Sequence, residues 1–487
     1  MSKPNIVLIT TDQQRFDTLA PYAPSFLRTP HLDHLMRDGV VFERAYADCP
    51  VCVAARASIM TGKYARNHGI PNNSETSKRI GRENTLPSLL RQAGYQTAAI
   101  GKMHFGPERC RHGFDEMILP ADYYRHMQKS GAMLQPMRHG LGQNELYPGM
   151  ATVPECCTLT SWIAEQCLEY IKFRRDPTVP FFLWCSFSKP HPPLDPPEPY
   201  YSMYRHSPIP EPIQSEWSIG KQRPIAFRRH QESWSSDLLP LEIIREARAA
   251  YYGLITQIDY NIGRIFAALQ DCGLFDETLF VFISDHGEYL GDHHTAGKCF
   301  MHEVSARIPF ILRLPKSWPG RHYGKRVQHL VTPADILPTL LAAAGGNPPE
   351  NLDGQNLLAF LESHQRPRTY LPAMICPGEV QPEKVWYLGI TDGHWKYIWY
   401  PEGPSEQLFD LDSDPQEIVD LADNLECKNL KISMQEMLVA EEKRCGGELL
   451  PNGNLPTFSF HGDSTAERRA NPWPGYHTEF FGVDVRH

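Results

Sequence analysis

Continuous apolar runs alternate along most of the chain with segments in which apolar residues recur at helical spacing. An apolar run bounded by polar residues is typical of a strand buried on both faces of a parallel sheet. Such runs open the segments 5–10, 95–106, 180–193 and 278–288. Helical patterns lie between them, most clearly at 161–174 and at 246–274, where Gly273 ends the pattern. The alternation predicts an α/β fold with a mostly parallel sheet flanked by helices.

Polar side chains follow these strands where the strands end. The carboxyl ends of parallel strands meet at one edge of the sheet, and ligands bind there. The groups at these ends belong to Asp12, Gln13, Lys102, His104, His191, Asp285 and His286. We therefore expect one site at this edge.

The pattern changes after about residue 365. Aromatic and β-branched runs are broken by DGHW (392–395), which is typical of a hairpin turn, and an amphipathic helix is predicted over 430–444. We predict a larger domain over 1–366 that carries the site. A smaller α+β domain, with an antiparallel sheet, a helix and an irregular tail, is predicted over 367–487.

The net charge and the spacing of the cysteines mainly exclude classes of partner and of fold. The net charge of −9 in 487 residues leaves no electrostatic footprint for nucleic acid or for an anionic membrane. No stretch approaches the ~20 apolar residues that cross a bilayer, and no signal-peptide core is found. The 12 cysteines are irregularly spaced, unlike a disulfide framework. We expect a cytoplasmic protein with reduced thiols, or a periplasmic one if a signal peptide was removed. The sequence leaves the oligomeric state open.

The strand-end acids suit a metal ion. Asp12, Gln13, Asp285 and His286 offer two carboxylates, an amide oxygen and an imidazole. The oxygen ligands favour a hard divalent cation such as Ca²⁺, and the imidazole leaves Mn²⁺ open.

Positive side chains accompany these acids. Arg56 lies one helical turn after Cys52, and Lys298 lies in the loop after 278–288. The single residue between Lys102 and His104 places both on one side of an extended backbone. Fixed positive charge beside a metal is what an enzyme needs to hold a tetrahedral oxyanion.

Several segments match known motifs in order and spacing. The start, PNIVLITTDQQR, resembles a first strand with metal-binding acids, and CVAARASIMTGKY resembles a Cys-x-Pro-x-Arg signature followed by Thr-Gly. Further matches are GKMHFG, RHGFDE (111–116), KPHPP (189–193), SDHGEYLGDH (284–293), VSARIPFILRLP (304–315) and the long segment 393–417. Together they resemble the type I sulfatase family of the alkaline phosphatase superfamily, over nearly the whole chain. The resemblance implies an alkaline-phosphatase-like fold and hydrolysis of an organic sulfate ester, such as a sulfated sugar.

The resemblance also implies a chemical mechanism. Cys52 would be oxidised to Cα-formylglycine, whose hydrate attacks sulfur with one hydroxyl and expels sulfate through the other. The divalent metal would be bound by the four strand-end ligands Asp12, Gln13, Asp285 and His286, together with residue 52.

The remaining roles also come from the resemblance. Arg56 and Lys102 would hold the hydrate, and His104 would take the proton of its second hydroxyl. His191 and Lys298 would bind sulfate and protonate the leaving oxygen.

Five positions bear on maturation, metal choice and substrate. Ala54 stands where the common signature has Pro, so either a formylglycine-generating enzyme or a radical-SAM enzyme could convert Cys52. Gln13 and His286 replace the frequent Asp and Asn. His302 lies where many members carry an aromatic side chain and would bear on substrate choice, as would Asn73 through a substrate contact.

Three alternatives stay open. The closest is a phosphonate or phosphate ester hydrolase on the same scaffold, although phosphonate hydrolases lack the Lys102-x-His104 pair. A second is a non-catalytic binding relic with Cys52 unconverted. A third is a redox pair of Cys49 and Cys52, although Pro50-Val51 is unlike thioredoxin.

The substrate is expected to be small. Basic residues of the 195–240 loop could meet an acidic sugar such as a uronate. They are Arg205, His206, Arg223, Arg228, Arg229 and His230.

Overall fold

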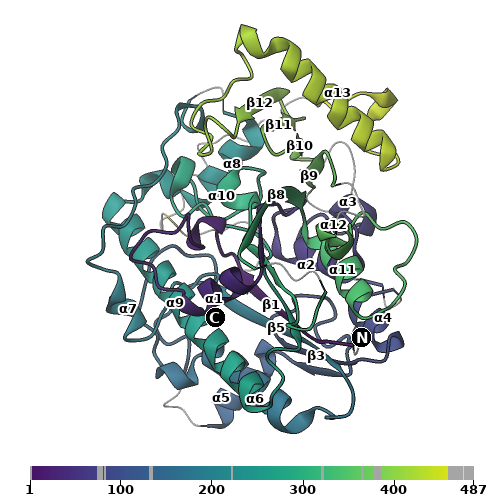
Figure 1. Ribbon diagram of the computed structural model, residues 1–487. Helices are drawn as coiled ribbons and strands as arrows, with labels where there is room; N and C mark the ends of the chain where they lie inside the picture. Colours follow the sequence, from purple (N-terminus) through teal and green to yellow (C-terminus); the bar gives the residue numbers. More distant parts are fainter. Residues whose placement is uncertain are drawn as a thin grey trace.

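A computed structural model of the protein describes residues 3–73, 80–81, 84–130, 135–220, 223–319, 323–362, 367–376, 385–458 and 475. Over these ranges the chain forms an eight-stranded sheet and a second, four-stranded sheet (Figure 1).

The large sheet confirms the predicted α/β fold. Its strands are β1 (Asn5–Asp12), β2 (Val40–Ala45), β3 (Gln96–Gly101), β4 (Glu116–Ile118), β5 (Phe181–Pro190), β6 (Thr278–Ser284), β7 (Phe310–Arg313) and β8 (Lys325–Val331). They are ordered β4-β3-β5-β1-β6-β7-β2-β8. All neighbours are parallel except that β7 runs antiparallel to β6 and β2. The sheet is therefore mixed but mostly parallel.

Both faces of this sheet are buried. In β1, Ile6 and Leu8 pack into one apolar core and Val7 and Ile9 into the other, because successive side chains of a strand point to opposite faces. The first core includes residues of α2 (Cys52–Thr61), α4 (Leu86–Gln92) and α11 (Ile336–Ala343). The second includes residues of α1 (Pro30–Asp38), α6 (Leu159–Glu169) and α9 (Leu241–Asp271).

Two of these helices show how far a periodic pattern predicts a boundary. α6 ends at Glu169 and passes into a π-helical turn over Tyr170–Arg174, which accounts for the predicted segment 161–174. α9 begins at Leu241, earlier than the predicted 246, and ends two residues before Gly273. Gly273 has φ +68°, a left-handed conformation that glycine adopts readily after a helix.

The second sheet contains β9 (Leu371–Ile375), β10 (Tyr387–Thr391), β11 (Trp395–Tyr400) and β12 (Ser405–Asp410). Its order is β12-β11-β10-β9 and all its pairs are antiparallel. α13 (Lys428–Arg444) lies beside this sheet (Figure 1). It packs on the strands through Met434 and Leu438, which lie in the same apolar core as strand residues. The predicted hairpin and helix are confirmed.

The domain division at 366/367 stays a prediction. Residues 363–366 beside it, and the predicted tail at 459–474 and 476–487, lie outside the described residues.

The remaining α-helices of the described ranges are α3 (Ala65–His68), α5 (Pro120–Lys129), α7 (Tyr200–Met203), α8 (Ile225–Trp234), α10 (Glu303–Ala306) and α12 (Leu357–Leu361). None of the helices in the described ranges is long and apolar enough to span a membrane.

Candidate active site

Cys52 is the first residue of α2, and a side chain from elsewhere caps this helix. Val51 before it is extended and its side chain cannot accept a hydrogen bond. Instead, Oδ1 of Asn73 accepts from the backbone N–H of Val53 at 2.9 Å and satisfies one of the amide groups that a helix start leaves open. The positive end of the helix dipole therefore lies at Cys52.

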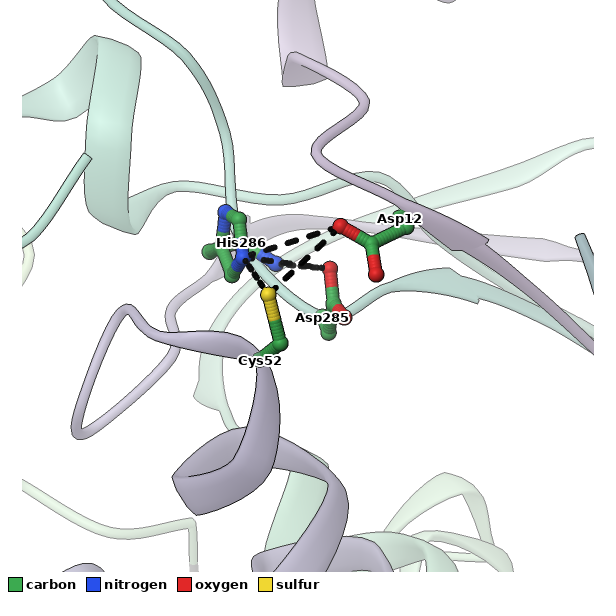
Figure 2. A group of neighbouring side chains, drawn as sticks. All are labelled: Asp12, Cys52, Asp285 and His286. Atoms are coloured by element: carbon green, nitrogen blue, oxygen red, sulfur yellow. Dashed lines mark hydrogen bonds and ion pairs between the residues drawn. The ribbon is translucent and has the colours of Figure 1, made fainter. Parts of the chain in front are cut away.

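Four buried side chains meet at this helix start (Figure 2). Asp12 ends β1, and Asp285 and His286 directly follow β6. Their ligand atoms and Sγ of Cys52 all lie within 4.8 Å of one another. Sγ is 3.1 Å from Nε2 of His286 and 3.6 Å from Oδ1 of Asp12. The acids converge because β1 and β6 are parallel neighbours.

The chemistry of this cluster fits a divalent cation. Nδ1 of His286 lies 2.9 Å from the carbonyl oxygen of Gly287. A carbonyl only accepts, so Nδ1 carries the proton and Nε2 offers its lone pair to the cluster. Burial and repulsion from Asp12 raise the pKa of Asp285 to about 6. A cation between the two carboxylates would favour the ionised form of both.

Arg56 is the internal counter-charge of these acids. Its Nε lies 2.9 Å from Oδ2 of Asp285 and its Nη2 lies 3.3 Å from Oδ2 of Asp12. Nη1 donates to Oγ of Ser186 at 2.8 Å and to the carbonyl of Lys102 at 2.5 Å. Burial opposes the charge, but Asp285 and Asp12 raise the pKa of Arg56 above its usual value. Arg56 is fully buried behind the acids and does not line the cavity described below.

Lys102 and His104 follow β3 and both line the cavity. Nζ of Lys102 is 2.5 Å from Oδ2 of Asp12 and 4.0 Å from Sγ of Cys52. The backbone is not extended as expected, because Gly101 has φ +105° and His104 has φ +64°. Burial and the charge of Lys102 lower the pKa of His104. A neutral ring of this kind can accept a proton.

Lys298 and Gln13 are paired beside the cluster. Nζ of Lys298 donates to Oε1 of Gln13 at 2.6 Å, and Nε2 of Gln13 donates to Glu288. Burial would lower the pKa of Lys298, but Cys52, Asp12 and Glu288 raise it. Ligation of a metal by the Gln13 oxygen stays a prediction.

His191 follows β5 and lines the same cavity. Its Nδ1 lies 2.8 Å from the carbonyl of Pro192, so Nδ1 carries the proton and Nε2 is an acceptor. Burial, with the charges of Lys298 and Lys102, holds the pKa of His191 well below its usual range. The ring is therefore neutral at neutral pH.

The electrostatic field around Cys52 favours an anion. Burial and Asp12 would raise the pKa of its thiol, but Lys102, Lys298 and His286 outweigh them and hold the pKa well below its usual range. Positive groups fixed in a buried pocket stabilise charge that develops on an oxyanion.

The cavity has a volume of about 600 Å³. Its charged and polar lining includes Cys52, Asn73, Lys102, His104, His191 and Lys298. Much of the remaining wall is apolar and comes from Phe105, Leu119, Tyr123, Tyr124, Met137, Val153 and Leu159. Such a lining suits a ligand that joins an anionic group to an apolar body.

The segment 195–240 is not a single loop, because α7 and α8 lie within it, and two of its six basic residues pair with acidic side chains elsewhere. Arg205 pairs with Glu246 at 2.8 Å and Arg229 with Glu402 at 2.6 Å. Of the six basic residues named above, His230 alone lines the cavity. The expected uronate-binding cluster is therefore not formed by the residues that the structure describes.

Of the two residues predicted to contact substrate, Asn73 lines the cavity and His302 does not. Asn73 lines the cavity while its oxygen caps α2. His302 is fully buried outside the cavity lining, with Nδ1 2.6 Å from the hydroxyl of Tyr289 and Nε2 3.1 Å from Oε1 of Gln407. This departs from the prediction for His302, because both its ring nitrogens already have protein partners.

Sequence reasoning missed Ser186 and Glu288. Ser186 bonds to Arg56, to Thr10 at 2.9 Å and to the carbonyl of Lys102 at 2.5 Å. Its only signal was a small polar residue inside an apolar run. Glu288 contacts Gln13, and its only signal was its place in the SDHGE motif.

Comparisons with known proteins agree with this geometry. Residues 4–346 match the family model described as Sulfatase. Residues 291–444 match the model for the C-terminal part of N-sulphoglucosamine sulphohydrolase.

Individual relatives extend over nearly the same length. An arylsulfatase of Clostridium perfringens is 34% identical over 469 residues, which cover 90% of this chain and 94% of the relative. The multifunctional alkaline phosphatase superfamily protein PehA of Trinickia caryophylli is 32% identical over 481 residues, covering 87% and 92%. The crystal structure of a phosphonate monoester hydrolase of Agrobacterium radiobacter has a TM-score of 0.77 and 25% identity, covering 91% of this chain and 96% of that chain.

The family model spans most of the chain, and it includes the strand ends that carry Asp12, Lys102, His191 and Asp285. The chain belongs to the sulfatase family, the sulfuric ester hydrolases of the alkaline phosphatase superfamily.

Proposed function

We propose that this protein hydrolyses a small organic sulfate ester and releases inorganic sulfate, with residue 52 converted to Cα-formylglycine and a divalent cation beside it. The position of Cys52 carries the proposal. Its Sγ lies 3.1 Å from Nε2 of His286 and 4.0 Å from Nζ of Lys102, in the lining of the cavity.

An unmodified thiol does not suit this reaction, because a thiol that captured the sulfuryl group would have no easy route to release it. A formylglycine hydrate at residue 52 would supply one hydroxyl to attack sulfur and a second to expel sulfate as the aldehyde re-forms. Conversion requires a formylglycine-generating or radical-SAM maturation enzyme as a partner.

The cation would be held by Asp12, Asp285 and His286, with Gln13 and residue 52 completing the set. Ca²⁺ suits the oxygen ligands and Mn²⁺ the imidazole. The bound ion would lower the pKa of the attacking hydroxyl and neutralise sulfate oxygens.

The side chains that line the cavity divide the remaining tasks. Lys102 and Lys298 direct positive charge at the sulfate oxygens, and the neutral ring of His104 takes the proton of the second hydroxyl. The proton of His191 is on Nδ1, bonded to Pro192. Lys298 is therefore the group that donates a proton to the leaving oxygen, whereas Nε2 of His191 could donate to sulfate only after taking up a proton.

The wall of the cavity favours an uncharged alcohol. Besides the groups at the sulfate, its charged lining residues in the described ranges are Glu108, Lys189 and Asp195, and Lys189 pairs with Asp195. The aromatic and aliphatic wall has no free cation among these residues to offset a carboxylate on the substrate. We propose that the alcohol is aromatic or a neutral sugar.

A phosphonate ester hydrolase is the second candidate, and the similarity to the Agrobacterium radiobacter enzyme favours it. Lys102 and His104 favour the sulfatase, because the phosphonate hydrolases are expected to lack this pair. The cavity can hold either tetrahedral anion, so the two candidates differ in the rates that they predict.

The test compares the two ester classes on protein of known state at residue 52. Mass spectrometry of the peptide that contains Cys52 reports conversion as a loss of about 18 Da. Converted protein is then assayed for kcat/KM on 4-nitrophenyl sulfate and 4-nitrophenyl phenylphosphonate. Faster hydrolysis of the sulfate is expected, and a large preference for the phosphonate would overturn the proposal. An unconverted residue 52 in protein from the native host would support the binding relic instead.

A further inference from the structure

A buried carboxylate lies behind two groups of the candidate active site. Glu288 is 1% exposed and does not line the cavity. Its side chain accepts hydrogen bonds from Gln13, Leu290 and Gly297. A buried carboxylate with this set of donors is fully engaged in holding other groups.

One oxygen of Glu288 closes the loop that directly precedes Lys298. Oε1 accepts from the backbone N–H of Leu290 at 2.9 Å and from that of Gly297 at 2.6 Å. Between these residues, Gly291, His293 and His294 have φ values of +95°, +50° and +56°. Left-handed conformations are costly for residues other than glycine and persist only where surrounding contacts hold them. Lys298 follows this closed loop directly.

The other oxygen determines how the Gln13 amide is turned. Oε2 accepts from Nε2 of Gln13, and a carboxylate cannot donate to the amide oxygen. Oε1 of Gln13 is thereby left to face Lys298, whose Nζ lies 2.6 Å away. The reversed amide would place two donors against each other.

We propose that Glu288 is a positioning residue that orients Lys298 and Gln13 together, so that Nζ reaches the leaving oxygen and the amide oxygen faces the cation. This inference rests on the proposed function. Glu288 itself touches neither substrate nor cation.

The variant Glu288→Gln tests the contact pattern at nearly unchanged volume. An amide in place of the carboxylate has one acceptor oxygen. Its NH₂ group would face either the Gln13 amide or the backbone N–H groups of Leu290 and Gly297, which now donate to Glu288. Either the Gly297 turn or the Gln13 amide must then lose its partner. The hydrogen bond from Arg15 to the backbone carbonyl of Glu288, at 2.9 Å, does not depend on this side chain.

The main readout is the dependence of the rate on the leaving group. 4-Nitrophenolate leaves readily without a proton, whereas phenolate is more basic and depends on proton donation. Glu288→Gln is expected to lower kcat/KM about 10-fold on 4-nitrophenyl sulfate and about 100-fold on phenyl sulfate. Equal losses on the two esters would overturn the inference.

A double-mutant cycle asks whether the effect passes through Lys298. Lys298→Ala is expected to change the ratio of the two rates in the same direction. Adding Glu288→Gln to it is expected to change the ratio no further, because residues that act as a unit are not additive. A full additional change would contradict a role through Lys298.

A measurement without turnover tests the Gln13 side. Titration calorimetry with Ca²⁺ and with Mn²⁺ is expected to show about 10-fold weaker binding by Glu288→Gln. The matched control is Glu442→Gln, which removes another buried carboxylate that pairs with Arg66 rather than with a cavity residue. Unchanged affinity in Glu288→Gln, or the same loss in the control, would count against the inference.

Two further results distinguish a failure of this inference from misfolding of a variant and from a failure of the proposed function. Should Glu288→Gln fail to fold, Glu288→Asp keeps the charge on a shorter side chain and is expected to alter the rate ratio about 3-fold. An unaltered ratio in that variant would overturn the inference. If converted wild-type protein hydrolyses neither sulfate ester, the proposed function fails, whatever the variants do.

Discussion

Nζ of Lys102 lies 2.5 Å from Oδ2 of Asp12 and 4.0 Å from Sγ of Cys52. The ammonium therefore bridges an acid at the end of β1 and the position of the proposed nucleophile. Asp12 ends β1 and Lys102 directly follows β3, and β5 lies between these two strands in the sheet. Replacing this charge should impair catalysis much more than folding, because the Lys102 side chain retains 17% exposure.

For Lys102→Ala we expect kcat on 4-nitrophenyl sulfate to fall by about 10²–10³-fold, the usual cost of removing one group that stabilises a developing oxyanion. The thermal midpoint should change little. The control is Lys172→Ala, which removes a surface lysine that pairs with Asp271 at 2.9 Å. A Lys102→Ala rate within about twofold of wild type would contradict the role of Lys102 in the site.

Arg56→Met is expected to destabilise the fold. The guanidinium is fully buried between Asp285 and Asp12, and its loss leaves the buried Asp285 without its guanidinium partner, while Asp12 keeps Lys102. Breaking a buried pair in this way costs about 3–5 kcal/mol of unfolding free energy. Urea denaturation of the metal-free protein measures this cost. Arg205→Met, at an exposed pair with Glu246, should cost only about 0.5 kcal/mol. Similar costs at the two positions would show that Arg56 is not the main counter-charge.

Asp48 should make stability fall as pH rises through the mildly acidic range. It is buried, accepts from the N–H of Ala65 at 2.6 Å and from Ser58 at 3.1 Å, and burial raises its pKa from 3.8 to about 6. Its contribution is complete below the unfolded pKa and is lost as pH rises through the folded pKa, because the unfolded chain releases the proton first. This difference in pKa between the folded and unfolded chain corresponds to about 3 kcal/mol.

The comparison uses Asp48→Asn, which cannot titrate. From about pH 4 to about pH 7, the difference in unfolding free energy should change by about 3 kcal/mol in favour of the variant. Parallel pH profiles of the two proteins would contradict the assignment.

The apolar cavity wall predicts discrimination against anionic alcohols. Phenyl sulfates that carry a 4-carboxylate or a neutral 4-carboxamide have similar size. We expect kcat/KM to be at least about 10-fold lower for the carboxylate, a difference of about 1.4 kcal/mol, because the wall near Tyr123, Tyr124 and Met137 would desolvate its charge without a cationic partner. A preference for the carboxylate would restore the acidic-sugar hypothesis.

The strand ends of this protein were predictable from local pattern. Apolar runs predicted β1, β5 and β6, and the residues directly after such strands lie at one edge of a parallel sheet. Asp12, Lys102, His191 and Asp285 could therefore be assigned to one site without knowing any contact. The hairpin around Gly393 and the helix α13 were predictable for the same reason, because turn chemistry and helical periodicity are local properties.

Side-chain partners were not predictable in this way. Glu288 and Gln13 are 275 residues apart, and Ser186 and Arg56 are 130 apart. Arg229 of α8 pairs with Glu402 rather than with substrate, and His302 forms hydrogen bonds with Tyr289 and Gln407. Nothing local distinguishes these partners from the other polar residues of the chain.

The order of residues was thus enough to determine the fold class, the edge of the sheet that holds the site and the cysteine at its centre. Folding alone decided which charges are exposed to substrate and which are neutralised inside the protein. The reason is physical: periodicity and strand ends depend on neighbours in the chain, whereas a buried charge is satisfied by whichever polar group packing brings within hydrogen-bond distance.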